Sequence, residues 1–265
     1  MKKKEIKCEL YHDNFQNYKR YAIPKAQLII ADIPYNLGIN AYASNPQWYN
    51  DGDRMKGESE LAAKSFFNGD GNFNLIEFMH FSNTMLKKEP KNRNEAGAMI
   101  IFCAFEQAQE LINIGKRYGF NHGYPIFFIK NYSSQILKAN QKIVGATEQA
   151  VVLYRNKLPK FRNEEKGMIK NWFDWPREFN TVKIHPTQKP IALLKNLIEI
   201  FTDEGDVIID PVAGSGSTLR AAKELGRPSF GFEVSRDFYK LAKEKMIEAR
   251  FIDKRIVARG AKPLF

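Results

Sequence analysis

The chain has 265 residues, of which 43% are hydrophobic and 27% are charged. This composition is typical of an ordinary globular protein and excludes disordered and collagen-like classes. The length suits one large domain with a sizeable core. Lys and Arg number 41 against 30 Asp and Glu, so the formal net charge is +11 and a polyanionic partner is favoured.

The cysteines and the apolar runs exclude further classes. Cys8 and Cys103 both lie in apolar segments and are too few for a disulfide framework or a zinc site, so we expect no metal. The basic N-terminus, MKKKEIKCELYH, has no apolar stretch behind it, and no run of the chain reaches membrane-spanning length. We therefore expect a cytoplasmic protein that has no membrane partner.

Strands and helices are predicted to alternate along most of the chain. Short continuous apolar runs predict strands over residues 7–11, 27–31, 98–104, 125–129, 148–154, 207–210 and 229–232. Apolar periodicity and capping residues predict helices over residues 75–87, 106–118, 190–201, 217–225 and 237–250, the last opened by an Asp cap. Because such strands alternate with helices, the predicted fold class is α/β, with a doubly wound, mostly parallel sheet in a single domain over 1–265.

Two long segments interrupt this alternation, and loops of such length in a compact domain are usually functional or mobile. Residues 36–74 are rich in Asn, Gly and aromatic residues and carry three basic against five acidic residues. Residues 155–189 carry nine basic and four acidic residues, interrupted by aromatic rings that suit bases or sugars. The candidate nucleic-acid-contacting residues of this basic segment are Arg155, Lys157, Lys160, Arg162, Lys170, Trp172, Arg177 and Lys183.

A glycine turn follows the strand predicted over 207–210. The segment DPVAGSGSTL, which begins at Asp210, places backbone N–H groups and a helix start at the carboxyl edge of a sheet, where open α/β sheets bind ligands. It lacks the GK[ST] of a phosphate loop and the third Gly of the dinucleotide fingerprint, so a phosphate cradle is disfavoured. Glu233 ends the next strand, where a carboxylate can accept hydrogen bonds from both ribose hydroxyls. We therefore predict a nucleoside cofactor here.

The tetrapeptide DIPY follows the strand predicted over 27–31. The lone pair of an aromatic amino nitrogen is delocalised into its ring, and acceptance of its two N–H bonds by the Asp32 side chain and the Ile33 carbonyl would relocalise it. Tyr35 would stack on the base, an interaction worth roughly 1–3 kcal/mol. With an ordinary pKa of about 3.9, Asp32 is too weak a base to deprotonate the amine first, so we expect it to act as an acceptor. Taken alone, the tetrapeptide also fits a plain strand-to-loop turn in which Pro34 and the tyrosine merely pack.

The segment HPTQKP, which begins at His185, precedes a predicted helix. Thr187, Gln188 and Lys189 lie at the start of that helix, where free amide groups and a cationic side chain suit a carboxylate, such as that of a methionine moiety. A lone histidine is more often structural than catalytic, and we expect His185 to be structural.

The ordered set DIPY, HPTQKP and DPVAGSGSTL, with Glu233 downstream, resembles the beta class of S-adenosylmethionine-dependent DNA amino-methyltransferases, in which the catalytic motif precedes the cofactor motif. The resemblance spans nearly the whole chain and implies a Rossmann-like methyltransferase fold with a circularly permuted motif order. It implies that a base flipped out of duplex DNA is held by the catalytic residues Asp32, Ile33, Pro34 and Tyr35.

The resemblance also assigns the cofactor site, the DNA contacts and the partners. The implied S-adenosylmethionine-binding residues are Asp13, Asn14, Asp32, Thr187, Gln188, Lys189, Asp210, Pro211, Gly214, Ser215, Gly216, Ser217, Thr218, Glu233 and Val234. Residues 155–183 become the candidate target-recognition segment, and residues 36–74 an active-site loop that closes over the flipped base or fills its gap. A cognate restriction nuclease that acts separately, and a homodimer, are both compatible with this family.

One residue departs from the family pattern. The second residue of the catalytic tetrapeptide is usually proline, whereas here it is Ile33; the required carbonyl belongs to the backbone and is retained. Asp32 resembles the adenine-modifying members more than the cytosine-modifying ones, so we predict methyl transfer to the exocyclic amino group of adenine in duplex DNA. Transfer to the cytosine amino group, methylation of RNA or of a protein amide, and a non-catalytic nucleic-acid-binding module remain alternatives.

Overall fold

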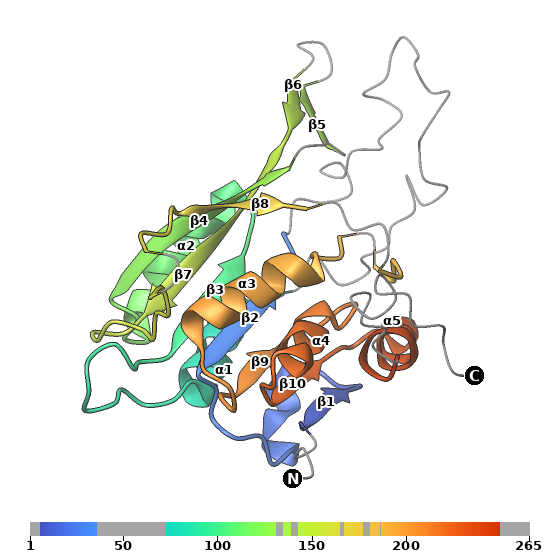
Figure 1. Ribbon diagram of the computed structural model, residues 1–265, viewed down its shortest axis with the longest axis horizontal. Coiled ribbons are helices and arrows are strands. Elements are labelled where there is room, and N and C mark those ends of the chain that lie inside the picture. Colours follow the sequence, from blue (N-terminus) through green and yellow to red (C-terminus); the bar gives the residue numbers. More distant parts are fainter. Residues whose placement is uncertain are drawn as a thin grey trace, which may run out of the picture.

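A computed structural model describes residues 6–35, 73–130, 135–138, 143–164, 167–176, 181–185 and 187–249. Its centre is an eight-stranded sheet in the order β1-β10-β9-β2-β3-β7-β4-β8 (Figure 1). In that order the strands are β1 (Cys8–Tyr11), β10 (Ser229–Phe232), β9 (Ile208–Asp210), β2 (Leu28–Asp32), β3 (Ala98–Phe102), β7 (Thr147–Tyr154), β4 (His122–Lys130) and β8 (Trp172–Trp175). Neighbouring strands are parallel, except that β7 is antiparallel to both β3 and β4.

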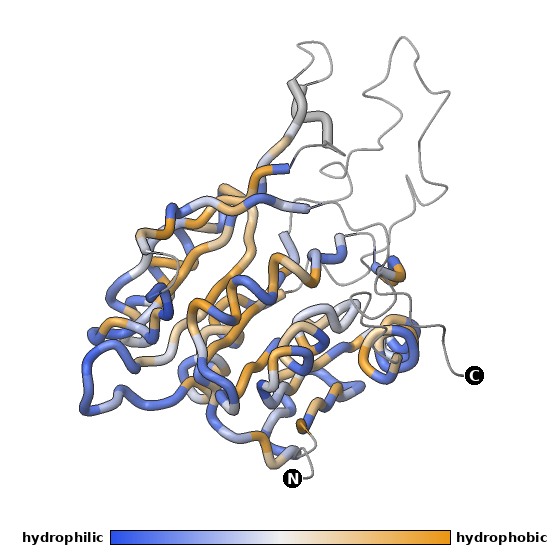
Figure 2. Tube along the Cα trace, in the orientation of Figure 1, coloured by the Kyte–Doolittle hydropathy of each residue, from blue (hydrophilic) through white to orange (hydrophobic). Residues whose placement is uncertain are grey.

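Helices cover both faces of this sheet, which confirms the predicted doubly wound α/β fold. On one face the 3-10 helix η1 (Phe15–Arg20), α1 (Leu75–Met85) and α2 (Phe105–Arg117) pack against alternate residues of the strands. On the other face α3 (Ile191–Phe201) and α4 (Ser217–Glu224) cover the remaining ones. Apolar residues accordingly concentrate in the central strands and α3, and polar residues in the loop after α1 (Figure 2). No helix in the described part of the chain has the length and apolarity to cross a membrane.

The structure adds three strands that the sequence did not predict. The hairpin of β5 (Gln135–Lys138) and β6 (Ile143–Gly145) projects away from the main sheet (Figure 1). Strand β8 lies inside the segment 155–183, which we expected to be an irregular loop, and pairs with β4 at the edge of the sheet. Its sequence, WFDW, is too short to stand out from the polar residues around it, and only the exposed edge of β4 makes it a strand.

The last predicted helix, over 237–250, differs in the structure. Ser235, and not Asp237, caps helix α5 (Arg236–Leu241), because the Ser235 hydroxyl accepts the Phe238 N–H at 3.4 Å. The chain then continues as a π-helix, η6 (Ala242–Ile247). Its end packs beside α4 through Ile247. Residues from 250 onward lie outside the described part of the chain.

Strand directions decide which residues meet at each edge of the sheet. Strands β2 and β9 are parallel neighbours, with Ile29 opposite Ile209, so both end at the same carboxyl edge. Strand β7 runs the other way and delivers the chain to the opposite, amino edge at Tyr154. Strand β4, which precedes β7 in the chain and is antiparallel to it, ends at the carboxyl edge. Strand β8 is parallel to β4 and ends at the same edge with Trp175.

Candidate active site

Two carboxylates from different motifs end neighbouring strands at the carboxyl edge. Asp32 is the last residue of β2, and Asp210 is the last residue of β9, the adjacent parallel strand. Their sequence separation is large, yet the pairing places the DIPY and DPVAGSGSTL segments side by side. Asp210 is buried, whereas the Asp32 side chain keeps 27% exposure, so a substrate can reach it.

The DIPY turn is fixed by β3 and α2. The Ile33 N–H donates to the Phe102 carbonyl at 3.3 Å, and the buried Ile33 side chain packs in the core under α1 and α2. Gln107 donates its side-chain N–H to the Pro34 carbonyl at 2.9 Å and accepts the Ala104 N–H at 3.0 Å. Gln107 was not predicted, because its place beside Pro34 arises only when α2 docks on the sheet.

Lys189 contacts Asp32 directly. Its Nζ lies 2.5 Å from Asp32 Oδ2 and 3.5 Å from Glu148 Oε2, and its side chain is only 6% exposed. The sequence predicted that Lys189 stands at a helix start and holds a cofactor carboxylate. The structure starts α3 at Ile191 with Pro190 as its N-cap, so Lys189 does stand at the helix start, and its ammonium group points to the end of β2.

Glu148 and Lys130 extend this contact into a charge cluster of four residues, Asp32, Lys189, Glu148 and Lys130. Glu148, at the start of β7, pairs with Lys130, at the end of β4. Burial raises the pKa of Asp32 above its ordinary value, and the Lys189 charge opposes that rise. Burial opposes the charge of Lys189 too, but the carboxylates of Asp32 and Glu148 outweigh it and raise the lysine pKa.

The turn after β9 forms an open cradle of backbone groups. Gly214 and Gly216 have φ values of +51° and +76°, a backbone conformation that residues with a side chain rarely adopt. A Cβ on Gly214 would meet no atom within 4 Å, whereas one on Gly216 would lie 3.4 Å from the Ala242 Cβ. Asp210 accepts the Val212 N–H at 3.1 Å and steadies the first residues of the turn. Gly214 therefore faces free space at the predicted cofactor position, while Gly216 permits close packing of the C-terminal helix.

Ser215, Ser217 and Thr218 continue this cradle into α4. The hydroxyls of Ser215 and Ser217 lie 2.7 Å apart, and both residues are buried. The Thr218 hydroxyl bonds to Asp210, whose pKa is nevertheless raised to about 7, mainly by burial and further by nearby carboxylates. Pro211 occupies the turn between β9 and the cradle.

Glu233 lies beside the cradle at the end of β10. Its carboxylate accepts the Gly214 N–H at 2.9 Å on one oxygen and the Ser235 N–H at 2.6 Å on the other. The Val234 N–H also bonds to this carboxylate. Of the roughly four acceptor sites of a carboxylate, one is left for a ribose hydroxyl. Burial raises the pKa of Glu233 to about 6. Val234, next in the chain, is 65% exposed. The open glycine turn and this carboxylate fit a nucleoside cofactor.

Asp13 and Asn14 lie at the same edge, because β1 pairs with β10 and the Glu233 N–H donates to the Tyr11 carbonyl at 3.0 Å. Both side chains are engaged within the chain. Asp13 accepts from Asn17 at 2.6 Å and from Tyr21 at 2.8 Å. Asn14 caps η1 by accepting the Gln16 N–H at 3.0 Å. Their side chains hold the turn after β1 at the edge of the sheet where the glycine cradle lies.

The HPTQKP segment is held by its own side chains. The Thr187 hydroxyl lies 3.0 Å from His185 Nδ1. Gln188 accepts the Ile184 N–H at 3.0 Å and donates to the Val182 carbonyl at 3.1 Å. Burial lowers the pKa of His185 to about 4, which fits the structural role predicted for it. These contacts fix the backbone that leads to Lys189.

Four of the candidate DNA-contacting residues lie at the amino edge of the sheet, opposite the edge at which Asp32 lies, and contact other parts of the chain. Because β7 runs antiparallel to β3, Arg155 emerges at the amino edge, where it donates to the carbonyls of Lys87 and Asn83 at 2.9 and 3.0 Å. Lys157 donates to the carbonyls of Pro90 and Lys91 at 2.7 and 3.0 Å.

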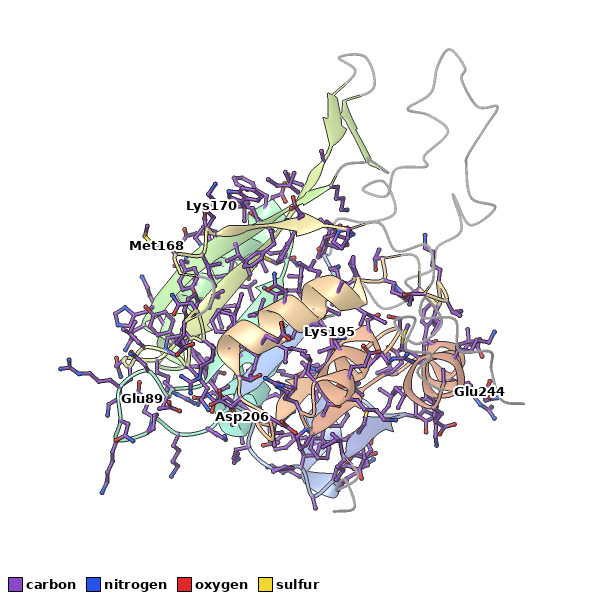
Figure 3. All side chains as sticks on the ribbon, viewed as in Figure 1. Glu89, Met168, Lys170, Lys195, Asp206 and Glu244 are labelled. Carbon is purple, nitrogen blue, oxygen red and sulfur yellow. The ribbon has the colours of Figure 1, made fainter. Side chains whose placement is uncertain are left out.

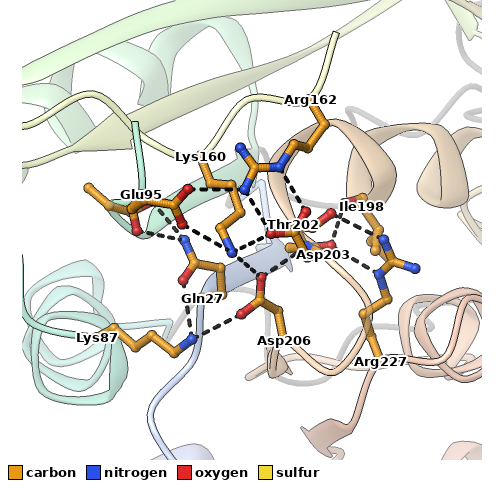
Figure 4. A network of polar contacts seen from close by, with 11 residues as sticks. Gln27, Lys87, Glu95, Lys160, Arg162, Ile198, Thr202, Asp203, Asp206 and Arg227 are labelled. Carbon is orange, nitrogen blue, oxygen red and sulfur yellow. Dashed lines mark hydrogen bonds and ion pairs between the residues drawn. The ribbon is translucent and has the colours of Figure 1, made fainter. Parts of the chain in front are cut away.

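Lys160 and Arg162 belong to a network of ion pairs at the amino edge, which we call the amino-edge network (Figure 4). The Lys160 side chain is 8% exposed and lies 2.7 Å from Asp203, 2.8 Å from Asp206 and 3.4 Å from Glu95. Arg162 pairs with Asp203 at 2.7 Å and with Glu95 at 3.0 Å. Their charges are balanced by carboxylates of the same chain.

The remaining candidates have a different setting. Lys170 and Trp172 are exposed beside β8, with the Lys170 Nζ 5.2 Å from the Trp172 ring, and Lys183 is exposed before α3. Figure 3 shows Lys170 beside β8 and well separated from Asp206 of the amino-edge network. Arg177, like residues 36–72 of the predicted active-site loop, lies outside the described part of the chain.

The doubly wound fold, in which the DIPY strand precedes the glycine-turn strand and pairs with it, is that of the α/β methyltransferases. The family profile of DNA methylases matches residues 26–244. The chain therefore belongs to the family of S-adenosylmethionine-dependent DNA amino-methyltransferases, which modify adenine or cytosine amino groups, and the predicted resemblance is confirmed.

Individual proteins show the same relationship. The chain is 26% identical to DNA adenine methyltransferase YhdJ of Escherichia coli, over 91% of this chain and 83% of YhdJ. It is 30% identical to Type II methyltransferase M.HindIII of Haemophilus influenzae, over 59% of this chain and 52% of that protein. The crystal structure of the M1.HpyAVI–SAM complex matches with a TM-score of 0.63 and 23% identity, over 90% of this chain and 98% of that one. The cytosine-N4-specific PvuII DNA methyltransferase matches with a TM-score of 0.63 and 14% identity, over 94% and 90%.

Proposed function

We propose that this protein transfers a methyl group from S-adenosylmethionine to the exocyclic amino group of adenine in duplex DNA. The observation that carries the proposal is the position of Asp32. It ends β2 beside the glycine cradle of β9, and its side chain remains partly exposed. An amino group that bonds to Asp32 would therefore lie next to a cofactor held by the cradle.

Asp32 acts in this proposal as a hydrogen-bond acceptor. Lys189 bonds to one carboxylate oxygen, and the Tyr35 hydroxyl is a further partner. Because each oxygen can accept two hydrogen bonds, the carboxylate keeps capacity for an amino N–H. The Ile33 carbonyl would accept the second N–H, and the two contacts would relocalise the nitrogen lone pair. Correct placement of both reactants can supply roughly 7–11 kcal/mol of the barrier reduction. Gln107 supports this geometry, because it fixes the Pro34 carbonyl and with it the turn.

Cofactor binding is proposed for the cradle and its neighbours. When bound, S-adenosylmethionine supplies an electrophilic methyl group. The Gly214 region would hold its methionine part, and the Glu233 carboxylate would accept from a ribose hydroxyl. Val234, exposed beside Glu233, offers an apolar surface to the adenine ring.

DNA binding is proposed for the carboxyl edge and the adjoining strand β8. The target base must leave the duplex, at a cost of a few kcal/mol, and protein contacts must offset that cost. Lys170 precedes β8, Trp172 is its first residue, and Lys183 lies in the segment before α3; all three are exposed. We assign phosphate and sugar contacts to them, in place of the four residues at the amino edge.

The test is modification-sensitive long-read sequencing of DNA from cells that express the chain, with Asp32→Ala and Asp32→Asn variants alongside. We expect methyladenine at a defined sequence with the wild type and no signal with Asp32→Ala. Asp32→Asn keeps an acceptor oxygen, so we expect reduced but measurable transfer. If methylcytosine is the product, the substrate is the cytosine amino group and the proposal for adenine is wrong.

Two other outcomes would change the class of activity. Methyl incorporation into RNA or a protein amide, with none into DNA, would favour those substrates. Binding of DNA and cofactor without any signal dependent on Asp32 would indicate a non-catalytic module. A separate restriction nuclease would appear as cleavage of unmodified DNA at the same sequence, and sedimentation of the purified chain would test the homodimer.

A further inference from the structure

The ammonium group of Lys189 lies between two carboxylates at the carboxyl edge. It is 2.5 Å from Asp32 Oδ2 and 3.5 Å from Glu148 Oε2. The rings of Phe102 and Trp175 enclose it further, with centroids 5.1 and 5.6 Å from Nζ. A lysine enclosed in this way is held in one position and does not extend into solvent.

All the groups around this ammonium project from the same face of the sheet, the face that α3 covers. Asp32 and Phe102 are register partners on β2 and β3, and Lys130 and Trp175 are partners on β4 and β8. Glu148 shares the face with Phe128, its partner on β4. Because side chains alternate along strands, this convergence requires five strands, β2, β3, β4, β7 and β8, in the correct register.

The cluster alternates in charge from Asp32 through Lys189 and Glu148 to Lys130, which makes it neutral as a whole. Lys130 pairs with Glu148 and lies 4.6 Å from the Trp175 ring centroid. Glu148 is therefore anchored by a second cation. A paired Glu148 in turn holds Lys189 against Asp32.

We propose that Lys189 is a positioning residue for the catalytic carboxylate of Asp32, and that Glu148, anchored by Lys130, holds Lys189 in that place. This inference rests on the proposed function of Asp32. It replaces the predicted contact between Lys189 and a cofactor carboxylate. The ammonium group occupies one acceptor position on Oδ2, and the carboxylate keeps others for the substrate N–H.

The positioning also controls the protonation state of Asp32. Only an ionised carboxylate has both oxygens free as acceptors, and burial together with Glu148 and Asp210 favours the protonated form. Lys189 is the cation in direct contact with Asp32, with the Tyr35 hydroxyl as a further hydrogen-bond partner. The Cys103 thiol also lies close enough to interact electrostatically with Asp32.

Opposite pH shifts follow for two substitutions. Lys189→Met removes a positive charge beside Asp32, so the Asp32 pKa should rise and the acidic limb of the rate profile should move to higher pH. Glu148→Gln removes a negative charge of nearly the same shape, so the limb should move to lower pH. A residue that only stabilises the fold would shift neither limb in a charge-dependent direction.

The experiment uses the full-length chain and a duplex that contains the methylated sequence. Single-turnover methyl transfer is measured from pH 5 to 9 for the wild type, Lys189→Met, Lys189→Arg and Glu148→Gln, beside the dissociation constant of S-adenosylmethionine. We expect Lys189→Met to lower the rate constant at least tenfold, with less than a threefold change in cofactor affinity. Lys189→Arg should recover part of the rate, because the charge is retained.

Lys160→Met is the matched control. Lys160 is also a buried lysine between carboxylates, with 8% side-chain exposure against 6% for Lys189, but it lies at the opposite edge of the sheet. Its substitution should lower stability without moving the pH profile or the rate per folded molecule. A loss of cofactor affinity as large as the loss of rate in Lys189→Met would overturn the proposal in favour of carboxylate binding.

A readout without turnover separates this inference from the proposed function. Carboxylate carbon NMR can follow the titration of Asp32 in the folded chain, with Asp32→Asn to assign the signal. Opposite shifts in Lys189→Met and Glu148→Gln, and none in Lys160→Met, are expected even if DNA proves not to be the substrate. If Asp32 titrates with the same pKa in the wild type, Lys189→Met, Glu148→Gln and Lys160→Met, the inference is overturned, whatever the methylation result.

Discussion

The carboxylate of Glu233 accepts the backbone N–H of Gly214 at 2.9 Å, so the end of β10 holds the glycine turn that follows β9. Glu233 therefore has two tasks, because it shapes the cradle and also keeps an acceptor site beside it. The second oxygen accepts the Ser235 N–H at 2.6 Å and connects the same carboxylate to the start of α5. The proposed cofactor site is thus built from the ends of two adjacent strands.

Substitution of Glu233 should weaken cofactor binding. Hydrogen bonds to charged groups contribute about 1.5–3 kcal/mol, and about 1.4 kcal/mol corresponds to a tenfold change in affinity. We expect Glu233→Ala to raise the dissociation constant of S-adenosylmethionine roughly ten- to a hundredfold, measured by titration calorimetry. The control is Glu224→Gln, because Glu224 is a carboxylate on α4 that pairs with Lys195 and Arg220. This variant should bind S-adenosylmethionine with unchanged affinity. Equal affinities for both variants would exclude the assigned role.

Asp210 should make the cofactor-free protein less stable at high pH. Its pKa is about 7 in the folded chain against an ordinary 3.8, so the folded state binds more protons between these values. The contribution of Asp210 to stability is therefore complete below pH 4 and decreases as the pH rises through 7. Asp210→Asn should raise the free energy of unfolding at pH 8 by a few kcal/mol, since one pKa unit is about 1.4 kcal/mol. Urea denaturation would show this gain as a higher midpoint. An unchanged free energy of unfolding for Asp210→Asn at pH 8 would contradict this prediction.

DNA affinity should depend on the β8 region and not on the amino edge. Lys170→Gln and Lys183→Gln should each reduce the slope of log affinity against log salt by about one, and Trp172→Ala should cost about 1–3 kcal/mol. Lys157→Gln is the comparison, because its Nζ already donates to the carbonyls of Pro90 and Lys91. Fluorescence anisotropy at several salt concentrations measures all four. If Lys157→Gln reduces the salt slope and Lys170→Gln and Lys183→Gln do not, the DNA contact predicted for Lys157 from the sequence would be favoured.

The amino-edge network should contribute to stability alone. Removal of one partner from a buried ion pair costs roughly 3–5 kcal/mol, whereas an exposed pair contributes at most about 1 kcal/mol. Lys160→Met should therefore lower the unfolding free energy by several times as much as Lys7→Met, whose pair with Glu9 has side chains 54% and 36% exposed. Urea denaturation provides the measurement. Similar losses in the two variants would show that the network carries no special stability.

The sequence by itself determined the elements and the order of the motifs. Seven strands and most helices follow from local patterns, because an apolar run or a 3.6-residue periodicity is encoded by neighbouring residues. The glycines of the cradle and the DIPY tetrapeptide were also visible, since their function depends on backbone conformation within a few residues. Strand β8 was missed, because its pairing depends on a free edge of β4 and its own four residues carry little signal.

The tertiary structure alone decided which charges meet. The direction of β7 sends Arg155, Lys160 and Arg162 to the amino edge, and no local pattern records whether a strand runs parallel or antiparallel to its neighbour. Lys189 and Asp32 are far apart in the chain, and their contact depends on how α3 docks on the sheet. The tertiary structure therefore divided the basic segment between the amino-edge network and strand β8, because charge composition is local and charge pairing is not.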